Sequence, residues 1–295
     1  MRSYTGWKRL PARALALGLA VAVLSGSAGA SSFSDTGGHW AARGISRMAL
    51  KGVVRGYSDG SFKPESTVSR LEAVVMLVRG LGLEARAAQT TSIPAAFRNP
   101  EFVPDWGRGY VAVAVTEGIV AGSDLVSFRG PDPATRAEVA TFISRAMGLD
   151  SRAAALAGSP LRFTDAGSIP TESRGHVAAV VEAGIMQGNP DGSFQPRSPI
   201  TRAEMATLLT RVDNVLENAL DAAEVRGRLL AVADTGAGAL TLRGSDGATL
   251  SFSLAPGAEV YALEGTLPAR LGDLVVGDDV TLLLDVQGRA VFVES

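Results

Sequence analysis

The chain has 295 residues, of which 46% are hydrophobic and 20% are charged, with 28 lysines and arginines against 30 acidic residues. This near-neutral balance gives no reason to expect nucleic acid or an acidic membrane surface as a partner. The sequence contains no cysteine and two histidines, which excludes disulfides, thiol nucleophiles, cysteine-ligated metals and a histidine-rich metal site.

Residues 1–30 have the three-part pattern of a secretory signal peptide. Four basic residues precede an apolar run over residues 14–24, and Ala28-Gly29-Ala30 supplies small residues before a cleavage site. The apolar run is too short to cross a bilayer, which takes about 20 residues. We therefore predict that the mature chain starts at Ser31, is secreted and has no transmembrane span.

A repeat with a period of 66 residues follows the signal peptide. Glycine, phenylalanine, arginine and glutamate recur three times in one register. The recurring sets are Gly52, Gly118 and Gly184; Gly56, Gly122 and Gly188; Phe62, Phe128 and Phe194; Arg70, Arg136 and Arg202; and Glu72, Glu138 and Glu204. We predict three repeats, over residues 31–92, 93–157 and 158–222.

Each repeat is predicted to contain two helices joined by a glycine-rich loop. The first helix covers about residues 40–51, 106–117 and 174–183, with Trp40 and Trp106 on its apolar face and a glycine at its C-terminal end. The loop carries an Asp-Gly turn signal in the first and third repeats. Its acidic residues could suggest calcium, but the spacing and the final glutamate of an EF-hand are missing.

The second helix of each repeat begins with the pattern Ser/Thr-Arg-x-Glu. The hydroxyl and the glutamate of this pattern form a capping box, in which each side chain accepts a hydrogen bond from the backbone amide of the other residue. The six capping residues are Ser69, Glu72, Thr135, Glu138, Thr201 and Glu204. Capping explains these residues, so we assign no catalytic role to them.

Capping does not explain the arginine of this pattern, which is Arg70, Arg136 or Arg202. A guanidinium group at a helix N-terminus can bind an anion together with the backbone amides. The alternative is a structural ion pair with an aspartate of a neighbouring repeat, and one arginine could serve both purposes.

The repeated elements combine into one long motif. In the first repeat it reads Phe33-x-Asp35, Trp40-Ala41, Gly52-x-x-x-Gly56-Tyr57-x-Asp59-Gly60-x-Phe62-x-Pro64 and Ser69-Arg70-x-Glu72. The third repeat fits it equally well, from Phe163-x-Asp165 to Thr201-Arg202-Ala203-Glu204. This motif resembles the S-layer homology domain. The resemblance implies a pseudo-threefold bundle of helical repeats that binds a secondary cell-wall polysaccharide without a covalent bond.

The repeats depart from this motif to different degrees. The middle repeat has Asn99, Leu125 and Gly130 at the places of Asp35, Asp59 and Pro64. The third repeat has Glu172 at the place of the tryptophan. We therefore expect unequal grooves, of which one or two bind ligand.

The resemblance also implies which residues bind carbohydrate. In that family the polymer often carries a pyruvate ketal, whose carboxylate would suit the helix-start arginines. The implied residues are Arg70, Arg136, Arg202, Trp40, Trp106, Asp35, Asp165, Gly56, Gly122 and Gly188. The aspartates would bind sugar hydroxyls or orient the arginine, and the glycines would allow close backbone approach. The tryptophans would pack on a sugar ring or, alternatively, lie in the core.

The hydrophobic period changes after a helix expected from Arg202 to about Glu224. Short alternating runs separated by turn signals predict a small all-β barrel or sandwich over residues 223–295. The runs lie at residues 227–232, 238–242, 248–254, 260–263, 280–286 and 290–294. Its few aromatic residues do not support an aromatic platform for sugar, and the sequence does not indicate a partner for this module.

Together these features predict a multidomain α + β protein, with three helical repeats followed by a small β-module. We expect a secreted, non-catalytic protein of the cell wall, S-layer or cell envelope that uses no cofactor or metal. Its partner would be a cell-wall polysaccharide or a peptidoglycan-linked polymer. Two alternatives stay open: the repeats could deliver a cell-wall hydrolase, or the β-module could assemble laterally in an S-layer or link envelope layers. We expect structural roles for His39 and His176.

Overall fold

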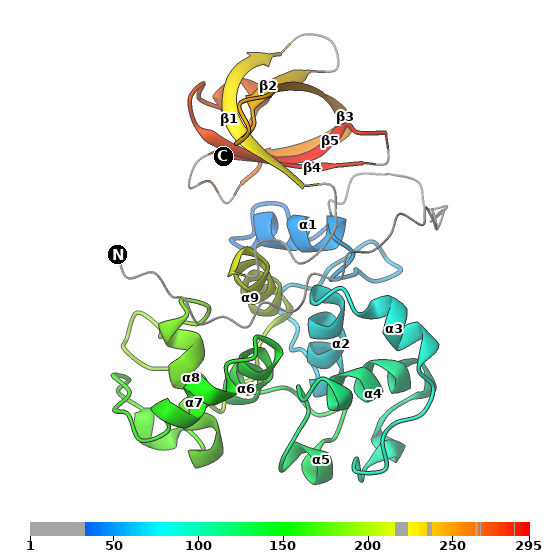
Figure 1. Cartoon of the computed structure of the whole chain (residues 1–295), viewed down its shortest axis with the longest axis vertical. Helices are drawn as coiled ribbons and strands as arrows, with labels where there is room; N and C mark the ends of the chain where they lie inside the picture. Colours follow the sequence, from blue (N-terminus) through cyan, green and yellow to red (C-terminus); the bar gives the residue numbers. More distant parts are fainter. Residues whose placement is uncertain (1–32, 216–223, 235–237, 263–264, 266, 286) are drawn as a thin grey trace.

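The computed structural model describes residues 33–215, 224–234, 238–262, 265, 267–285 and 287–295. The signal peptide predicted over residues 1–30 lies outside the described residues. The described chain forms a helical region over residues 33–215 and a β-barrel from residue 224 onward (Figure 1). The predicted order, a helical repeat region followed by a small β-module, is confirmed.

Two main helices in each repeat build the helical region. The first helices are α1 (Ala42–Leu50), α4 (Arg108–Thr116) and α8 (Thr171–Glu182), and the second helices are α2 (Arg70–Gly80), α6 (Arg136–Ala146) and α9 (Arg202–Val215). Shorter elements are α3 (Glu84–Gln89), α5 (Asp124–Ser127), α7 (Asp150–Leu156) and the 3-10 turns η1 (Pro100–Phe102), η2 (Asp105–Gly107) and η3 (Ala166–Ser168). These shorter elements are not predictable from the sequence, because a helix of one or two turns shows no clear hydrophobic period.

Each second helix begins at its capping box. The Ser69 hydroxyl accepts a hydrogen bond from the Glu72 amide at 3.2 Å, and the Glu72 carboxylate accepts one from the Ser69 amide at 2.8 Å. Thr135 with Glu138, and Thr201 with Glu204, form the same reciprocal pair. These bonds satisfy amides that the helix itself leaves without a partner.

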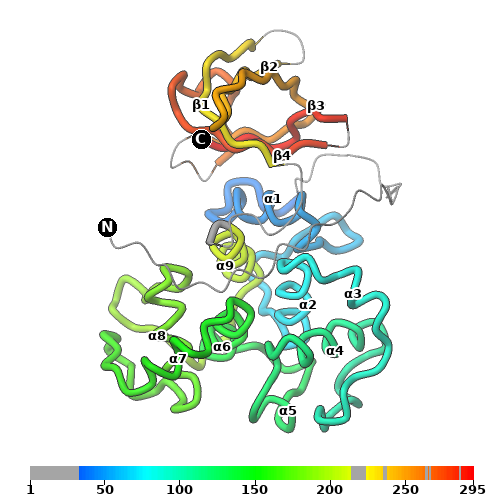
Figure 2. The backbone as a smooth tube through the Cα atoms, viewed as in Figure 1, coloured from blue at the N-terminus to red at the C-terminus, as the bar shows by residue number. Residues whose placement is uncertain are grey.

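The starts of the second helices are joined by a closed cycle of three backbone hydrogen bonds. The Val68 amide donates to the Ile200 carbonyl at 2.9 Å, the Ile200 amide to the Ala134 carbonyl at 2.9 Å, and the Ala134 amide to the Val68 carbonyl at 2.8 Å. All three residues are buried. Helix α2 contacts both α6 and α9, and the three helices lie in the middle of the helical region (Figure 2). Every repeat is therefore tied to both of the others.

One hydrophobic core runs through all three repeats. The recurring loop phenylalanines Phe62, Phe128 and Phe194 are buried in it. Ile45 and Val111 from the first helices belong to the same cluster. Because each repeat contributes to a shared core, the repeats support one another.

The β-module is a closed barrel of five strands in the order β1-β2-β3-β5-β4. The strands are β1 (Glu224–Ala233), β2 (Ala239–Arg243), β3 (Thr249–Tyr261), β4 (Asp279–Leu284) and β5 (Ala290–Glu294), with η4 (Leu271–Asp273) between β3 and β4. Strands β3 and β5 pair in parallel, and the other neighbours pair antiparallel. The barrel encloses a core that is separate from that of the helices.

The structure corrects two boundaries of the predicted β-module. The runs at residues 248–254 and 260–263 belong to one long strand, β3, so the six predicted runs form five strands, within the five or six that the sequence suggests. A register shift between Leu254 and Glu259 interrupts the alternation that would have joined the two runs. The helix expected to reach about Glu224 does not do so, because Glu224 is the first residue of β1. Residues 216–223 lie outside the described residues.

The outer surface of the barrel rests on helix α1. Tyr261, Leu283 and Phe292 point out of the barrel and form an apolar cluster that packs against Leu50. Tyr261 and Phe292 stack with their ring centroids 5.3 Å apart. The barrel and the first repeat therefore share a packed contact.

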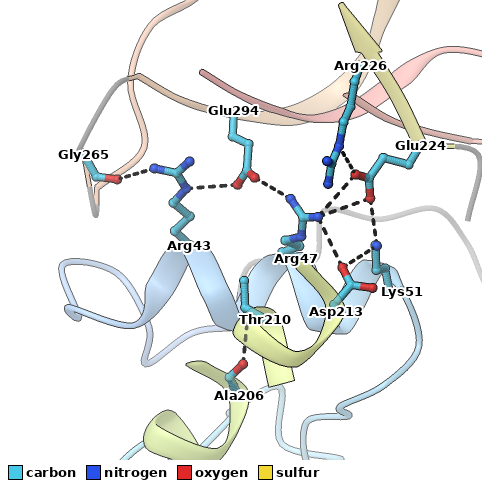
Figure 3. A network of polar contacts seen from close by, with 10 residues as sticks. All are labelled: Arg43, Arg47, Lys51, Ala206, Thr210, Asp213, Glu224, Arg226, Gly265 and Glu294. Atoms are coloured by element: carbon cyan, nitrogen blue, oxygen red, sulfur yellow. Dashed lines mark hydrogen bonds and ion pairs between the residues drawn. The ribbon is translucent and has the colours of Figure 1, made fainter. Parts of the chain in front are cut away.

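A network of charged side chains surrounds this apolar contact (Figure 3). Arg47 of α1 bonds to Glu294 of β5, to Glu224 of β1 at 3.2 Å and to Asp213 of α9 at 3.2 Å. Lys51 bonds to Asp213 at 2.6 Å and to Glu224 at 2.8 Å. Burial alone would raise the pKa of Glu224, but the hydrogen bond from Lys51 and the charges of Arg47 and Lys51 hold that pKa below its usual value.

The network is buried, so each of its charges needs a partner of opposite charge. The Arg47 side chain is 1% exposed and that of Lys51 is fully buried. A buried charge that loses its partner is strongly destabilising, typically by about 3–5 kcal/mol. The network therefore fixes how the barrel sits on α1 and α9. The network is not predictable from the sequence, because its residues come from four elements, and α1 and β5 are far from the other two in the chain.

Candidate functional site

Two grooves lie at equivalent places between successive repeats. The first groove, of about 280 Å³, lies between repeats one and two, and the second, of about 460 Å³, lies between repeats two and three. The first groove is lined by Ser69, Leu71, Glu72, Pro104, Trp106, Gly130 and Pro131. The residues 66 positions further along, Thr135, Ala137, Glu138, Pro170, Glu172, Pro196 and Arg197, all line the second groove. The repeat thus builds one groove twice.

The lining of the two grooves differs in chemistry. The first groove has Trp106 and Pro131 where the second has Glu172 and Arg197. The second groove also extends over α5 and α6, where Arg145 binds Asp124 at 2.6 Å. The first groove accordingly has one aromatic ring and one charged side chain, Glu72, whereas the second has several charged side chains of both signs. The sequence predicts unequal grooves, and the linings of these two grooves are unequal.

The tryptophans predicted on an apolar helix face lie at the surface. Trp40 is 51% exposed and Trp106 is 61% exposed. The assignment of both to the apolar face is wrong, because each precedes its helix: Trp40 lies before α1 and Trp106 lies in the η2 turn before α4. Trp106 lines the first groove, and Trp40 occupies the same place in the first repeat.

The helix-start arginines bond to the neighbouring repeat. Arg70 bonds to the capping Glu138 with its Nε at 2.9 Å and its Nη2 at 2.6 Å, and lies 3.4 Å from Asp132. Arg136 bonds to the capping Glu204 at 3.2 Å. The sequence predicts only a capping role for Glu138 and Glu204. In the structure each also accepts a hydrogen bond from the arginine of the preceding repeat.

Two of these arginines also hold the loop of the repeat that they contact. Arg202 donates to the carbonyls of Phe62 at 2.8 Å and Arg55 at 2.7 Å. Arg136 donates to the corresponding carbonyls of Phe194 at 2.9 Å and Gln187 at 3.2 Å. Arg70 makes no such carbonyl bond within the described residues. The sequence offered an ion pair with a neighbouring aspartate as the alternative role. Arg70 makes one with Asp132, whereas Arg136 and Arg202 pair with the glutamates Glu204 and Glu72.

The predicted carbohydrate-binding aspartates act inside their own repeats. The Asp35 carboxylate accepts hydrogen bonds from the amides of Phe62 and Lys63, both at 2.7 Å. Asp165 accepts the equivalent bonds from Phe194 and Gln195, both at 2.8 Å. Desolvation would raise the pKa of Asp35, but the two backbone hydrogen bonds outweigh it and lower that pKa. Each aspartate therefore closes the loop of its repeat against the start of that repeat.

The middle repeat closes its loop with the opposite polarity. The amide group of Asn99 donates to the carbonyls of Val126 at 2.8 Å and Phe128 at 3.2 Å. The Phe128 carbonyl corresponds to the carbonyls that Arg136 and Arg202 bind in the other repeats. In the middle repeat, Asn99 thus binds the loop carbonyl that an arginine of another repeat binds in repeats one and three.

The recurring glycines Gly56 and Gly188 are approached by aromatic rings. A Cβ atom on Gly56 would lie 2.3 Å from the ring of Phe33, and one on Gly188 would lie 2.7 Å from the ring of Phe163. Gly122 differs, because its φ is +60° and a Cβ atom there would have the Arg145 guanidinium as its nearest neighbour, at 3.8 Å. At Gly56 and Gly188 the missing side chain therefore leaves room for a ring of the same repeat.

The two histidines have protein partners. His39 bonds to Glu65 at 2.7 Å, and His176 bonds to the hydroxyl of Ser144 at 3.0 Å. Burial lowers the pKa of His176.

Across the described residues, no helix combines the length and the apolar character that crossing a membrane requires.

Some groove residues were missed from the sequence. Glu172 and Arg197 line the second groove, although the sequence analysis noted Glu172 only as a departure from the motif and did not single out Arg197. The available signal was their register, because they stand 66 positions after Trp106 and Pro131.

Comparison with known proteins identifies the repeats. Residues 32–74, 102–140 and 162–206 match the model of the S-layer homology domain. The chain carries three S-layer homology domains. The three matches include the capping boxes and both grooves' helix starts, so the predicted family is confirmed.

Several relatives of these S-layer homology domains are surface proteins. The chain is 29% identical to Cell surface glycoprotein 1 of Acetivibrio thermocellus over 55% of its own length and 7% of the relative. It is 26% identical to the Surface-layer 125 kDa protein of Lysinibacillus sphaericus over 66% of its length and 16% of the relative. An Endoglucanase of Bacillus sp. strain KSM-635 is 30% identical over 58% of the chain and 17% of the relative. The chain thus spans less than a fifth of each relative.

Two of these relatives are named as surface proteins, in line with the cell-surface location that the sequence predicts. Because one relative is named as an endoglucanase, such domains also occur in enzymes.

Proposed function

We propose that the protein anchors non-covalently to the bacterial cell wall by binding wall polysaccharide in the grooves between its repeats. The observation that carries this proposal is the first groove, where the exposed ring of Trp106 stands at a hollow of about 280 Å³. An indole offers a broad apolar face and an N–H donor. That combination suits a sugar, which presents both C–H groups and hydroxyls.

A pseudo-threefold arrangement of the repeats belongs to the same proposal. The cycle of hydrogen bonds between Val68, Ile200 and Ala134 supports it. Repeats arranged in this way offer a groove at each junction, and Trp40 would serve the junction of repeats three and one as Trp106 serves the first groove. Several weak contacts along one polymer chain raise the overall affinity by avidity.

The acidic substituent of the polymer, which the family resemblance suggests is a pyruvate ketal, needs a cationic partner. Of the helix-start arginines, Arg70 is the best placed, because its side chain is 21% exposed and that of Arg202 is 5% exposed. A ligand carboxylate at Arg70 would share the guanidinium group with Glu138 and Asp132. Arg197 is a second candidate, since it is exposed in the second groove and has no ion-pair partner among the described residues.

The aspartates and glycines of the predicted site would act indirectly. Asp35 and Asp165 hold the loops against the repeat starts, and Gly56 and Gly188 leave room for the phenylalanine rings. Their proposed contribution to binding is the shape of the loop, whose carbonyls hold Arg202 and Arg136 in place.

The test of this proposal is co-sedimentation with purified sacculi. We expect Trp106→Ala to weaken binding by about tenfold to a hundredfold, because large aromatic side chains dominate contacts of this kind. The matched control is Leu267→Ala, which removes a similarly exposed apolar side chain from the barrel. Equal binding by the parent and Trp106→Ala, or an equal loss in the control, would contradict the proposal.

The same experiment separates anchoring from catalysis. The endoglucanase among the relatives is the reason to test for turnover. Retention on sacculi without release of soluble fragments supports the non-catalytic anchor, and fragment release would favour a wall hydrolase. Denaturant should release the bound protein, because the attachment is non-covalent. Mass spectrometry of exported protein checks the predicted start at Ser31.

A further inference from the structure

The outer surface of the barrel has two faces of different character. The face made by β4, β5 and the end of β3 is covered by α1 through Tyr261, Leu283 and Phe292. The face made by β2, the part of β1 that pairs with it and the first half of β3 lies on the far side of the barrel from α1 (Figure 1), whereas the start of β1 reaches α1 through Glu224. The docking of the barrel therefore leaves the second face turned away from the repeats.

Two arginines stand side by side on this outward face. Arg228 of β1 and Arg243 of β2 are directly opposite each other in the antiparallel register, and both are exposed. Opposed residues in such a pair have their Cβ atoms about 4.5–5.5 Å apart, and like charges there are destabilising. Asp279 of β4 is in register with Arg228 on its other side. No ion pair or hydrogen bond links the Arg228 or Arg243 side chain to another described residue.

The surface beside the arginine pair is low and rich in hydroxyl groups. Thr249, Ser251 and Ser253 of β3 point outward at alternate positions and are exposed. Thr241 of β2 lies opposite Ser251, and their hydroxyl oxygens are 3.1 Å apart. Short side chains leave the two guanidinium groups standing above a floor of hydroxyls. An extended anionic chain can lie on such a floor and reach both arginines.

We propose that this outward face, formed by Arg228, Arg243, Thr241, Thr249, Ser251 and Ser253, is a second binding site for an anionic glycan bearing carboxylate or phosphate groups. An anion between the two guanidinium groups removes their mutual repulsion and accepts charge-assisted hydrogen bonds from both. The hydroxyl floor supplies donors and acceptors for the sugar. In five-stranded Greek-key barrels, the second and third strands form a ligand-binding face in other proteins.

The chemistry of the face favours a glycan over a nucleic acid. Single-stranded nucleic acid is held largely by stacking of bases on aromatic side chains. The outward positions of this face carry arginine, threonine, serine and alanine, and no aromatic residue among those described. The choice of a wall glycan as the source rests on the proposed anchoring function, whereas the anion preference rests on the arginine pair.

The test uses the full chain with the first groove disabled by Trp106→Ala. In this background, calorimetric titration with purified wall polysaccharide is compared for Arg228→Gln, Arg243→Gln and both together. We expect each single change to weaken binding by about tenfold and the double change to weaken it further. The control is Arg270→Gln, which removes an equal charge from an exposed barrel position outside this face.

Two ligand treatments identify the anion. Amidation of the carboxylates with a carbodiimide and amine abolishes the arginine-dependent part of binding if carboxylates are recognised. Hydrofluoric acid, which cleaves phosphodiesters, abolishes it if phosphates are recognised. Tighter binding to an oligothymidylate than to the polysaccharide would overturn the glycan assignment.

A stability measurement adds an independent readout. Without ligand, Arg228→Gln and Arg243→Gln should raise the melting temperature because they remove repulsion, whereas Arg270→Gln should not. Unchanged binding in the double variant, or a loss matched by Arg270→Gln, would overturn this inference. Failure of the parent protein to bind sacculi at all would instead reject the proposed anchoring function.

Discussion

The second repeat and its two neighbours solve the same loop-closing problem with different groups. In repeats one and three, a carboxylate accepts bonds from loop amides while an arginine of another repeat binds the loop carbonyls. In repeat two, the amide group of Asn99 binds the carbonyls itself, and the corresponding Arg70 bonds to Glu138 and Asp132. The departures from the motif are therefore linked to one another.

This comparison separates residues that hold the repeat together from residues that line a groove. The second repeat is the poorest copy of the motif, yet it contributes to both grooves, with Trp106 and Gly130 in the first and α6 in the second. Motif residues such as Asp35 and Gly56 report on loop closure. The strength of the motif in a repeat is accordingly no guide to its share in the lining of the grooves.

The largest difference between the repeats should appear at their loop glycines. A Cβ atom on Gly56 would meet the Phe33 ring at 2.3 Å and the Ser61 carbonyl at 2.7 Å, so Gly56→Ala should destabilise the fold by about 3 kcal/mol. Gly122→Ala faces only its positive φ and should cost about 1 kcal/mol. Urea unfolding followed by circular dichroism measures both. Equal costs would mean that the two loops are built alike.

The second-largest difference is expected in the stability lost when a helix-start arginine is replaced. Arg202→Gln leaves the Phe62 and Arg55 carbonyls without their charged donor in a buried place, and should cost about 2 kcal/mol of stability. Arg70→Gln breaks a partly exposed ion pair and should cost below about 1 kcal/mol. The same unfolding experiment compares them. A greater cost for Arg70→Gln would contradict the distinction drawn between the loops.

The smallest effect concerns acid sensitivity. The lowered pKa of Asp35 means that its contribution is fully present above its unfolded value of about 4 and is lost as the pH falls through the folded value. Asp35→Asn, which copies the second repeat, should cost about 1 kcal/mol near pH 7 and less at lower pH. Unfolding curves at several pH values between 2 and 7 test this. A loss that stays constant over this range would exclude the carboxylate charge as its cause.

The sequence predicts those parts of the molecule that depend on local spacing. The period of 66 residues and the Ser/Thr-Arg-x-Glu pattern predict the second helices, because capping is a contact between residues three apart. The same reasoning fails for Trp40 and Trp106, since a helix that starts two residues later no longer carries them on its buried face. A small shift of a boundary thus changes the environment of a large side chain.

Contacts between distant elements are harder to predict. The sequence places a β-module after the repeats, but Arg47, Asp213, Glu224 and Glu294 meet only because the barrel packs on α1 and α9. No spacing in the chain indicates this meeting. The grooves are similar in this respect, because each is formed by the start of the second helix of one repeat and by the start and the loop of the next repeat.

The cycle of hydrogen bonds between Val68, Ile200 and Ala134 takes one residue from each repeat and closes on itself. Each residue gives one amide and one carbonyl, so three copies close the cycle with every donor and acceptor used. Two copies in the same geometry would leave one amide and one carbonyl buried without partners, and a fourth copy would find the cycle already full. Three repeats are therefore the number at which this hydrogen-bond pattern leaves no buried donor or acceptor of these residues unused.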